Sequence, residues 1–366
     1  MKKSVFMRII GFLLAIMLFA ATFASCGSNG RENGTGTASE SDTAGETSTE
    51  NTVAEKDETV EKIRVGTLIG PTGMGMAYLM KQDFEGKTAY DYEFELMSAP
   101  ENMAAQVIAG SLDIAALPVN LAATLYKKTG GAYLLSAVNT LGVLYILENG
   151  DTVSSVSDLA GKTLYCTGQG AMPQYVVEYI IRQNGLKVVY EDAEDVPADS
   201  VRLVFMAEHA ELAAAMAAGT VSLGMLPEPN VTGASVKNAS LRVALDVTSE
   251  WGKVADASLI QGCVIVSKSF AEEHPLAYNA FLEEYGASVE YVNADVAFAA
   301  DIIQEFGILP SAAVAKAALP RCNIVFDNGA SAKDGVKAVL TVLFGYKPAL
   351  VGGSMPDEEF YSLLGK

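Results

Sequence analysis

The sequence predicts an α/β protein of two related lobes, each built on a largely parallel sheet. From Ile63 onward, short apolar runs alternate with helical stretches, which is typical of α/β layers. One unit of helix, glycine, polar residue, short strand and Leu-Pro occurs twice, at residues 104–118 and 213–227, and the two copies align without a gap. With 366 residues, the chain is long enough to form two well-developed cores.

The composition and the net charge limit the classes of molecule that we expect the protein to bind. Apolar residues make up 50% of the chain and charged residues 19%, which is typical of a globular protein. The formal net charge is −19. Because nucleic acid is bound mainly through cationic side chains, we expect no nucleic acid partner.

The first 60 residues read as a targeting segment and a tether. Residues 1–25 have a basic start at Lys2, Lys3 and Arg8 and an apolar run too short to span a membrane, which predicts a signal peptide. The Ala24-Ser25-Cys26 ending resembles a bacterial lipobox, which implies that Cys26 is lipidated and begins the mature protein; a plain secretory peptide is the alternative. Residues 26–60 comprise this cysteine and a polar, disordered tether.

The remaining cysteines and the two histidines indicate no catalytic or metal site. Cys166, Cys263 and Cys322 form no CxxC pair and lie in or beside apolar runs, so we expect buried free thiols, with a Cys166–Cys263 disulfide left open. His209 and His274 are far apart in the sequence. A histidine-based metal site, a Ser-His-Asp triad and a cofactor are therefore not predicted.

Two glycine-rich turns stand where a predicted strand meets a helix. Residues 70–76 follow the strand at 63–69, and residues 167–173 follow the strand at 162–166. Glycine allows a ligand to approach the backbone closely, and N–H groups point out of a helix start. Neither turn has the spacing of a P-loop or a dinucleotide fingerprint.

In open parallel sheets, ligands bind beyond the carboxyl ends of the strands. The loops expected there supply the predicted ligand-binding residues. They are Thr72, Gly73, Met74, Ser98, Asn102, Pro118, Asn120, Asn139, Gly168, Gln169, Gly170, Ala171, Met172 and Glu228. Ser98 is also expected to cap the helix that follows it, and Met76 is expected to fill the core.

Two extended stretches with a central glycine are expected to cross between the lobes as a two-strand hinge. They are residues 138–147, around Gly142, and residues 259–266, around Gly262. Further along the chain, residues 275–293, 295–306 and 311–319 are predicted to be helical.

Four segments together resemble the type 2 periplasmic solute-binding proteins of ABC importers, of the ThiY-like and SsuA-like groups. The segments are residues 109–115, 156–162, 226–229 and 270–275, and the resemblance covers residues 63 to about 364. It implies a Venus-flytrap fold with two hinge strands, with lobe I at 61–143 and 269–366 and lobe II at 144–268. It also implies a monomer, lipid-anchored on the extracytoplasmic face of the cell membrane, that delivers a small solute to an ABC permease and its ATPase.

The cleft loops also suggest what kind of solute is bound. They contain no Arg, Lys or His, and Glu228 is their clear acidic group beside Glu101. A small oxyanion needs cationic or N–H partners to replace its hydration, so we expect a neutral or partly cationic, flat or apolar molecule such as a nitrogen heterocycle. A capping role for Glu228 in its own turn is the alternative.

Two other functions stay open at this point. The first is an enzyme on the same fold, similar to thiamine-pyrimidine synthases or menaquinone-pathway dehydratases. The second is a sensory or adhesion lipoprotein. The export signal, the tether and the lack of a nucleophile–base pair in the sequence favour a binding protein over an enzyme.

Overall fold

The structure is a computed structural model that describes residue 57 and residues 59–365. These residues belong to one unit, Ala54–Lys366. The predicted signal peptide, Cys26 and most of the predicted tether lie outside the described residues.

The first sheet has six strands in the order β12-β4-β11-β3-β1-β2. β1 is parallel to β2 and β3, whereas β11 is antiparallel to β3 and β4, and β12 is antiparallel to β4. The strands are β1 (Ile63–Leu68), β2 (Tyr92–Met97), β3 (Ile114–Pro118), β4 (Tyr133–Leu141), β11 (Ile260–Ser267) and β12 (Ile324–Asp327). We call this sheet and the helices on it the first lobe.

The second sheet also has six strands, in the order β10-β5-β9-β6-β8-β7. β6 is parallel to β9 and β8, and β8 is parallel to β7, whereas β5 is antiparallel to β9 and β10. The strands are β5 (Leu144–Asn149), β6 (Thr163–Cys166), β7 (Lys187–Tyr190), β8 (Ser200–Phe205), β9 (Leu223–Pro227) and β10 (Leu241–Asp246). This sheet and its helices are the second lobe.

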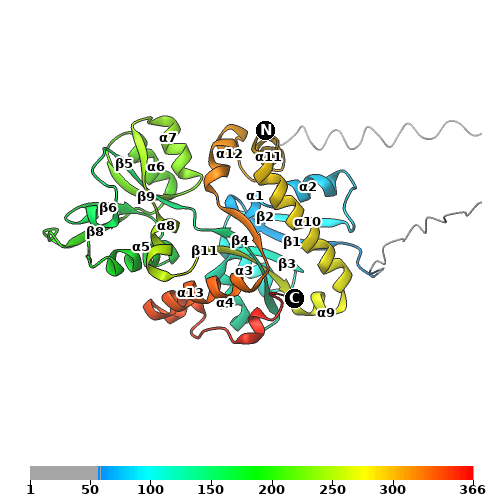
Figure 1. The fold of residues 1–366 in the computed structure, drawn as a ribbon. Coiled ribbons are helices and arrows are strands. Elements are labelled where there is room, and N and C mark those ends of the chain that lie inside the picture. The colour runs from blue at the N-terminus through cyan, green and yellow to red at the C-terminus, as the bar shows by residue number, and fades with distance from the viewer. Residues whose placement is uncertain (1–56, 58, 366) are drawn as a thin grey trace, which may run out of the picture. The chain divides into compact units, whose positions relative to one another are not determined.

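Helices cover both faces of each sheet (Figure 1). In the first lobe they are α1 (Pro71–Met74), α2 (Ala77–Phe84), α3 (Pro100–Ile108), α4 (Val119–Lys128), α9 (Lys268–Glu273), α10 (Pro275–Ala294), α11 (Val296–Glu305), α12 (Ala312–Ala318) and α13 (Ala330–Tyr346). In the second lobe they are α5 (Met172–Gln183), α6 (His209–Ala217), α7 (Asn230–Lys237) and α8 (Val247–Ala255). Four short 3₁₀ helices are η1 (Val156–Leu159), η2 (Leu319–Arg321), η3 (Pro348–Val351) and η4 (Glu358–Tyr361).

The predicted internal repeat corresponds to equivalent parts of the two lobes. The first copy forms α3 and β3, and the second forms α6 and β9. β3 lies between a parallel strand, β1, and an antiparallel strand, β11; β9 lies in the same way between β6 and β5. The two-lobed α/β prediction is therefore confirmed.

One local prediction is wrong. Ala99, not Ser98, is the N-cap of α3, and no side chain caps this helix, because the Pro100 ring begins it and Ser98 lies one residue too early. The extended stretch at 138–147 leads from the first sheet into the second, as expected of a crossing. It divides at Gly142 and Val143 into the end of β4, in the first sheet, and the start of β5, in the second.

The second predicted crossing begins at β11, and this strand belongs to the first sheet along its whole length, between β4 and β3. The lobe boundary expected at residue 268 stays a prediction. Among the described residues, no helix is both long and apolar enough to span a membrane.

Candidate functional site

Gly142 and Val143 link the two sheets, and we call this link the crossing. The strand directions place the predicted ligand-binding loops at the edge of each sheet that faces the crossing. β4 ends there and β5 begins there. Because β3 and β1 run in the same direction as β4, their carboxyl ends point to the crossing, and β9, β6 and β8 point to it from the second lobe. The first edge carries the turns after β1, β2 and β3, and the second edge carries those after β6, β8 and β9.

The glycine turn after β1 is packed into the first lobe. Gly73, Met74 and Gly75 are buried, whereas Thr72 is half-buried. A Cβ on Gly73 would lie 2.5 Å from the carbonyl oxygen of Leu68, so only glycine fits there. Met74 and Met76 are fully buried in the core against α10, which confirms the core role predicted for Met76.

The other predicted residues of the first edge differ in exposure. Ser98 and Asn102 are exposed around the start of α3. Pro118 and Asn120 are half-buried, and the Asn120 side-chain amide donates to the carbonyl oxygen of Leu350 at 3.4 Å. The segment after residue 345 thus covers this part of the edge, a contact that no local pattern predicts.

Asn139 is buried on β4, beside the crossing. Its Oδ1 accepts from the Thr140 hydroxyl at 3.2 Å, and a Cβ on Gly262 would lie 2.7 Å from this oxygen. Its Nδ2 and the Tyr285 hydroxyl are both buried without a hydrogen-bond partner in the described part of the chain. Burial raises the pKa of the Tyr285 hydroxyl. Both atoms are inaccessible, so in this arrangement Asn139 does not meet solvent.

On the second edge, the turn after β6 combines exposed glycine backbone with a polar network. Gly168 and Gly170 both have φ 75°, which favours glycine. The Gly170 N–H donates to Gln174 Oε1 at 2.6 Å. Gln169, Gly170 and Ala171 are exposed.

A hydroxyl–imidazole pair lies at the same edge and was not predicted. Thr167 follows β6 and His209 begins α6 after β8, and Thr167 Oγ1 lies 2.6 Å from His209 Nδ1. Burial lowers the pKa of His209, although the neighbouring Glu208 raises it, so the imidazole is neutral at pH 7. The sequence separation of 42 residues hides this pair from any local pattern.

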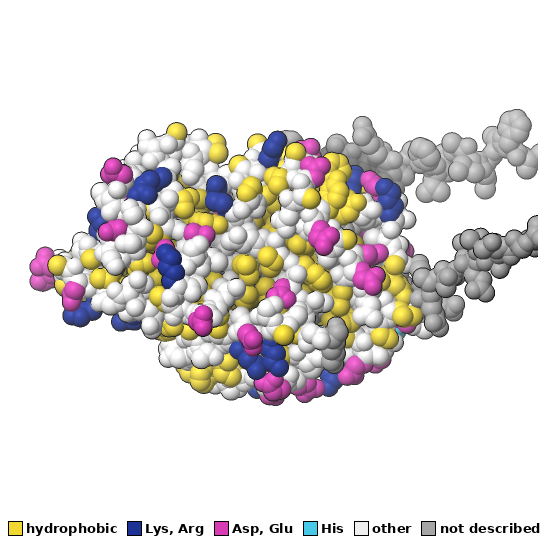
Figure 2. All heavy atoms as spheres, viewed as in Figure 1, with side chains coloured by type: hydrophobic (Ala, Val, Ile, Leu, Met, Phe, Trp, Pro, Cys, Tyr) yellow, Lys and Arg dark blue, Asp and Glu magenta, His cyan; other side chains and the backbone are white. Residues whose placement is uncertain are grey.

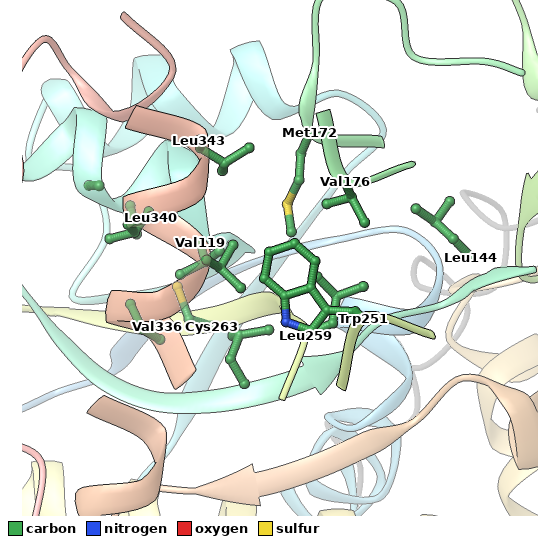
Figure 3. Close-up of a cluster of buried hydrophobic side chains, with 14 of the residues drawn as sticks. Val119, Leu144, Met172, Val176, Trp251, Leu259, Cys263, Val336, Leu340 and Leu343 are labelled. Atoms are coloured by element: carbon green, nitrogen blue, oxygen red, sulfur yellow. The ribbon is translucent and has the colours of Figure 1, made fainter. Parts of the chain in front are cut away.

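An apolar cluster joins the two lobes on one side of the crossing (Figure 3). Met172, at the start of α5, points toward the indole of Trp251 on α8. Val119, at the start of α4 in the first lobe, lies beside them. α13 adds Val336, Leu340 and Leu343 and packs on both α4 and α5. Met172 is 6% exposed, and its side chain is part of this cluster.

A polar cluster joins the lobes on another part of the edges. The Glu228 side chain is fully buried, and its Oε1 lies 2.5 Å from Arg321 Nε. Thr232 donates to the same carboxylate from its backbone N–H and its hydroxyl, both at 3.1 Å. Sequence analysis missed Arg321, which lies 93 residues away and outside every predicted ligand loop. Glu228 thus accepts hydrogen bonds from the residues that follow it, as the capping alternative predicts, and it also forms an ion pair with Arg321.

The three described cysteines are buried and free, as predicted. Burial raises the pKa of all three thiols, so they are poor nucleophiles. No group of three or more His, Cys, Asp or Glu side chains placed to hold a metal ion occurs among residues 57 and 59–365.

Two cavities lie away from the facing edges, at the opposite ends of the sheets. One of about 450 Å³ is lined by residues that precede β1 and β3, such as Lys62 and Asp113. The other, of about 410 Å³, is lined by Asn149 and Lys162, at the far ends of β5 and β6. Figure 2 shows acidic side chains at the outer tip of the second lobe, where the loop after β7 exposes Glu191, Asp192, Glu194 and Asp195.

Solved structures share this fold. An ABC transporter from Parabacteroides distasonis is 24% identical, with a TM-score of 0.67 over 82% of this chain and 98% of its own. The periplasmic aliphatic sulphonate binding protein SsuA from Escherichia coli is 15% identical, with a TM-score of 0.61 over 84% and 92%. The alkanesulfonate-binding protein SsuA from Xanthomonas axonopodis pv. citri, bound to MOPS, is 15% identical, with a TM-score of 0.54 over 84% and 95%.

No protein-family model matches the chain, and no curated protein matches it. The likeness therefore lies in the fold, which is that of two-lobed periplasmic binding proteins.

Proposed function

We propose that this protein is the extracytoplasmic solute-binding component of an ABC importer, which holds a small organic solute between its two lobes and delivers it to a permease. The observation that carries the proposal is the two-lobed fold with both sets of strand ends facing one crossing. Solved proteins with this fold include an ABC transporter protein and sulfonate-binding proteins. Fold alone does not fix function, so the proposal needs a test on the molecule itself.

The electrostatics of the edges favour a solute of low net charge. Glu228, the acidic group from which we expected a neutral or cationic solute, is paired with Arg321. This pair leaves neither charge free to recognise an ion of opposite sign. The exposed backbone at Gln169 and the neutral His209–Thr167 pair supply uncharged polar groups instead, whereas the Gly170 and Ala171 N–H groups already donate to Gln174 Oε1 and to the Gly168 carbonyl oxygen. A neutral heterocycle fits these groups better than a small oxyanion does.

Native mass spectrometry of the protein purified from the organism that encodes it is expected to reveal a retained small molecule. Adding that molecule to protein freed of it is expected to lower the radius of gyration in X-ray scattering, because the lobes close, and to raise the melting temperature, because it binds only the folded state. A solute that saturates the protein and leaves the radius of gyration unchanged would count against closure of the two lobes.

We also propose that Cys26 anchors the protein in the membrane. The Cys26→Ser variant is expected to lose metabolic labelling with palmitate and to move from the membrane fraction to the soluble fraction, because no other lipid attachment site is predicted. Ser28→Ala, a change in the tether, serves as the control and should keep both properties. Labelling that persists in Cys26→Ser would refute the lipobox assignment.

The enzyme alternative has one structural feature in its favour, the Thr167–His209 hydrogen bond. A catalytic hydroxyl–imidazole pair normally has a third group that orients the imidazole. No carboxylate bonded to His209 occurs in the described part of the chain. Binding is therefore the better supported function. Prolonged incubation with the retained solute, followed by mass spectrometry, separates the two, because only an enzyme would convert it.

A further inference from the structure

We propose that Arg321, Glu228 and Thr232 form a latch that, in the absence of solute, favours the arrangement of the two lobes seen here over a more open one. Arg321 Nε bonds Glu228 Oε1 at 2.5 Å, and its Nη2 donates to the Thr232 hydroxyl at 2.7 Å. The guanidinium therefore bridges two side chains that are already bonded to each other.

The two sides of the latch belong to different lobes. Arg321 ends η2, between α12 and the first-sheet strand β12. Glu228 follows the second-sheet strand β9, and Thr232 lies on α7. α12 also packs against α7, and the two helices lie next to each other in Figure 1. The ion pair is thus a contact that rotation of one lobe against the other must change.

The backbone on both sides is fixed beside the crossing. The Tyr145 hydroxyl, on β5, donates to the carbonyl oxygen of Arg321 at 2.8 Å, and the Asn323 side chain donates to the carbonyl oxygen of Gly142 at 2.6 Å. The Glu228 N–H donates to the carbonyl oxygen of Val143 at 2.9 Å. The Tyr145–Arg321 bond is itself a contact between the lobes and so adds to the latch, whereas the Asn323 and Glu228 bonds attach both sides of the latch to the crossing.

The burial of Glu228 explains why the latch favours one arrangement of the lobes over the other. The Glu228 side chain is 0% exposed, whereas that of Arg321 is 37% exposed. Separation of the lobes would leave the carboxylate without its cationic partner in a poorly hydrated place, which is unfavourable until water enters. The latch consequently raises the population of the arrangement seen here over a more open one without fixing it, so a solute that binds between the lobes still supplies part of the free energy of closure.

The chain offers a closely matched control. Arg242 Nη2 lies 2.5 Å from Glu148 Oε2, and these side chains are 37% and 6% exposed. This pair joins β10 to β5 within the second sheet. Arg242→Gln and Arg321→Gln therefore each remove an ion pair of the same length and similar burial, but only Arg321→Gln removes one between lobes.

The test is hydrogen exchange followed by mass spectrometry on the full chain without solute. Arg321→Gln is expected to speed exchange by about tenfold at residues 119–123 and 172–176, the starts of α4 and α5 in the apolar cluster that joins the lobes, because the open arrangement becomes more populated. Arg242→Gln is expected to leave both segments at the wild-type rate. Since no solute is needed, this result is independent of the proposed transport function.

A milder variant keeps the test valid should Arg321→Gln fold poorly. Glu228→Gln retains the shape and the acceptor for Thr232 but removes the charge, and it should speed exchange at the same two segments by a smaller factor. Exchange that rises only at residues 226–232 and 319–323 in both variants, or rises equally in Arg242→Gln, would overturn the latch.

Discussion

Trp251→Ala is expected to lower the free energy of unfolding by about 3–5 kcal/mol, the usual cost of removing a fully buried large aromatic side chain. Trp251 is 0% exposed and lies in the apolar cluster that joins the lobes, with its ring centroid 5.2 Å from that of Tyr179. Its Nε1 has no hydrogen-bond partner in the described part of the chain. The loss would therefore come from packing and the cavity left behind.

Urea denaturation followed by circular dichroism measures this loss, since the chain has a single tryptophan and the variant has no indole fluorescence. Phe84→Ala is the control, because Phe84 is 74% exposed and its truncation should cost less than about 1 kcal/mol. Equal costs for the two variants would show that the cluster contributes nothing beyond an exposed ring.

Gly142→Val is expected to destabilise the fold by about 1–3 kcal/mol or more and to weaken solute binding, because overpacking here displaces the crossing itself. A Cβ on Gly142 would lie 2.1 Å from Thr248 Oγ1 and 2.7 Å from Leu259 Cδ2. Thr248 lies on α8, which follows β10 of the second sheet, and Leu259 lies directly before β11 of the first sheet. Both neighbours are therefore at the junction of the lobes. Urea midpoints and calorimetry with the retained solute measure the two effects.

Two further variants identify the cause. Gly252→Ala is the control, since no atom lies within 4 Å of its Cβ position on α8, and it should be neutral or stabilising by about 0.5–1 kcal/mol.

Thr248 Oγ1 has no hydrogen-bond partner in the described residues, so Thr248→Ala removes the nearest clash at small cost. Gly142→Ala combined with Thr248→Ala should then be more stable than Gly142→Ala alone. Wild-type stability and affinity in Gly142→Val would remove Gly142 from the hinge.

Much of the fold was predictable because its signals are local. The strands β1 and β2, the repeated α3–β3 and α6–β9 units and the helix α10 each depend on residues close in sequence, such as Gly110 after α3 and Pro275 at the start of α10. Buried cysteines and the core role of Met76 followed in the same way from apolar runs. The predicted ligand loops lie at the facing edges because strand direction alone places them there.

The contacts across those edges were not predictable from the sequence. Arg321 pairs with Glu228 across 93 residues of sequence, and Thr167 bonds His209 across 42. The helix α13, which packs on α5 near Met172, lies more than 150 residues after it. No periodicity or motif encodes such pairings, because they depend on how two separately patterned lobes pack against each other. By itself the sequence determined the two lobes and placed the predicted ligand loops at their facing edges. The tertiary structure decided that Glu228 is neutralised by Arg321, since an ion pair depends on where two distant side chains meet in space.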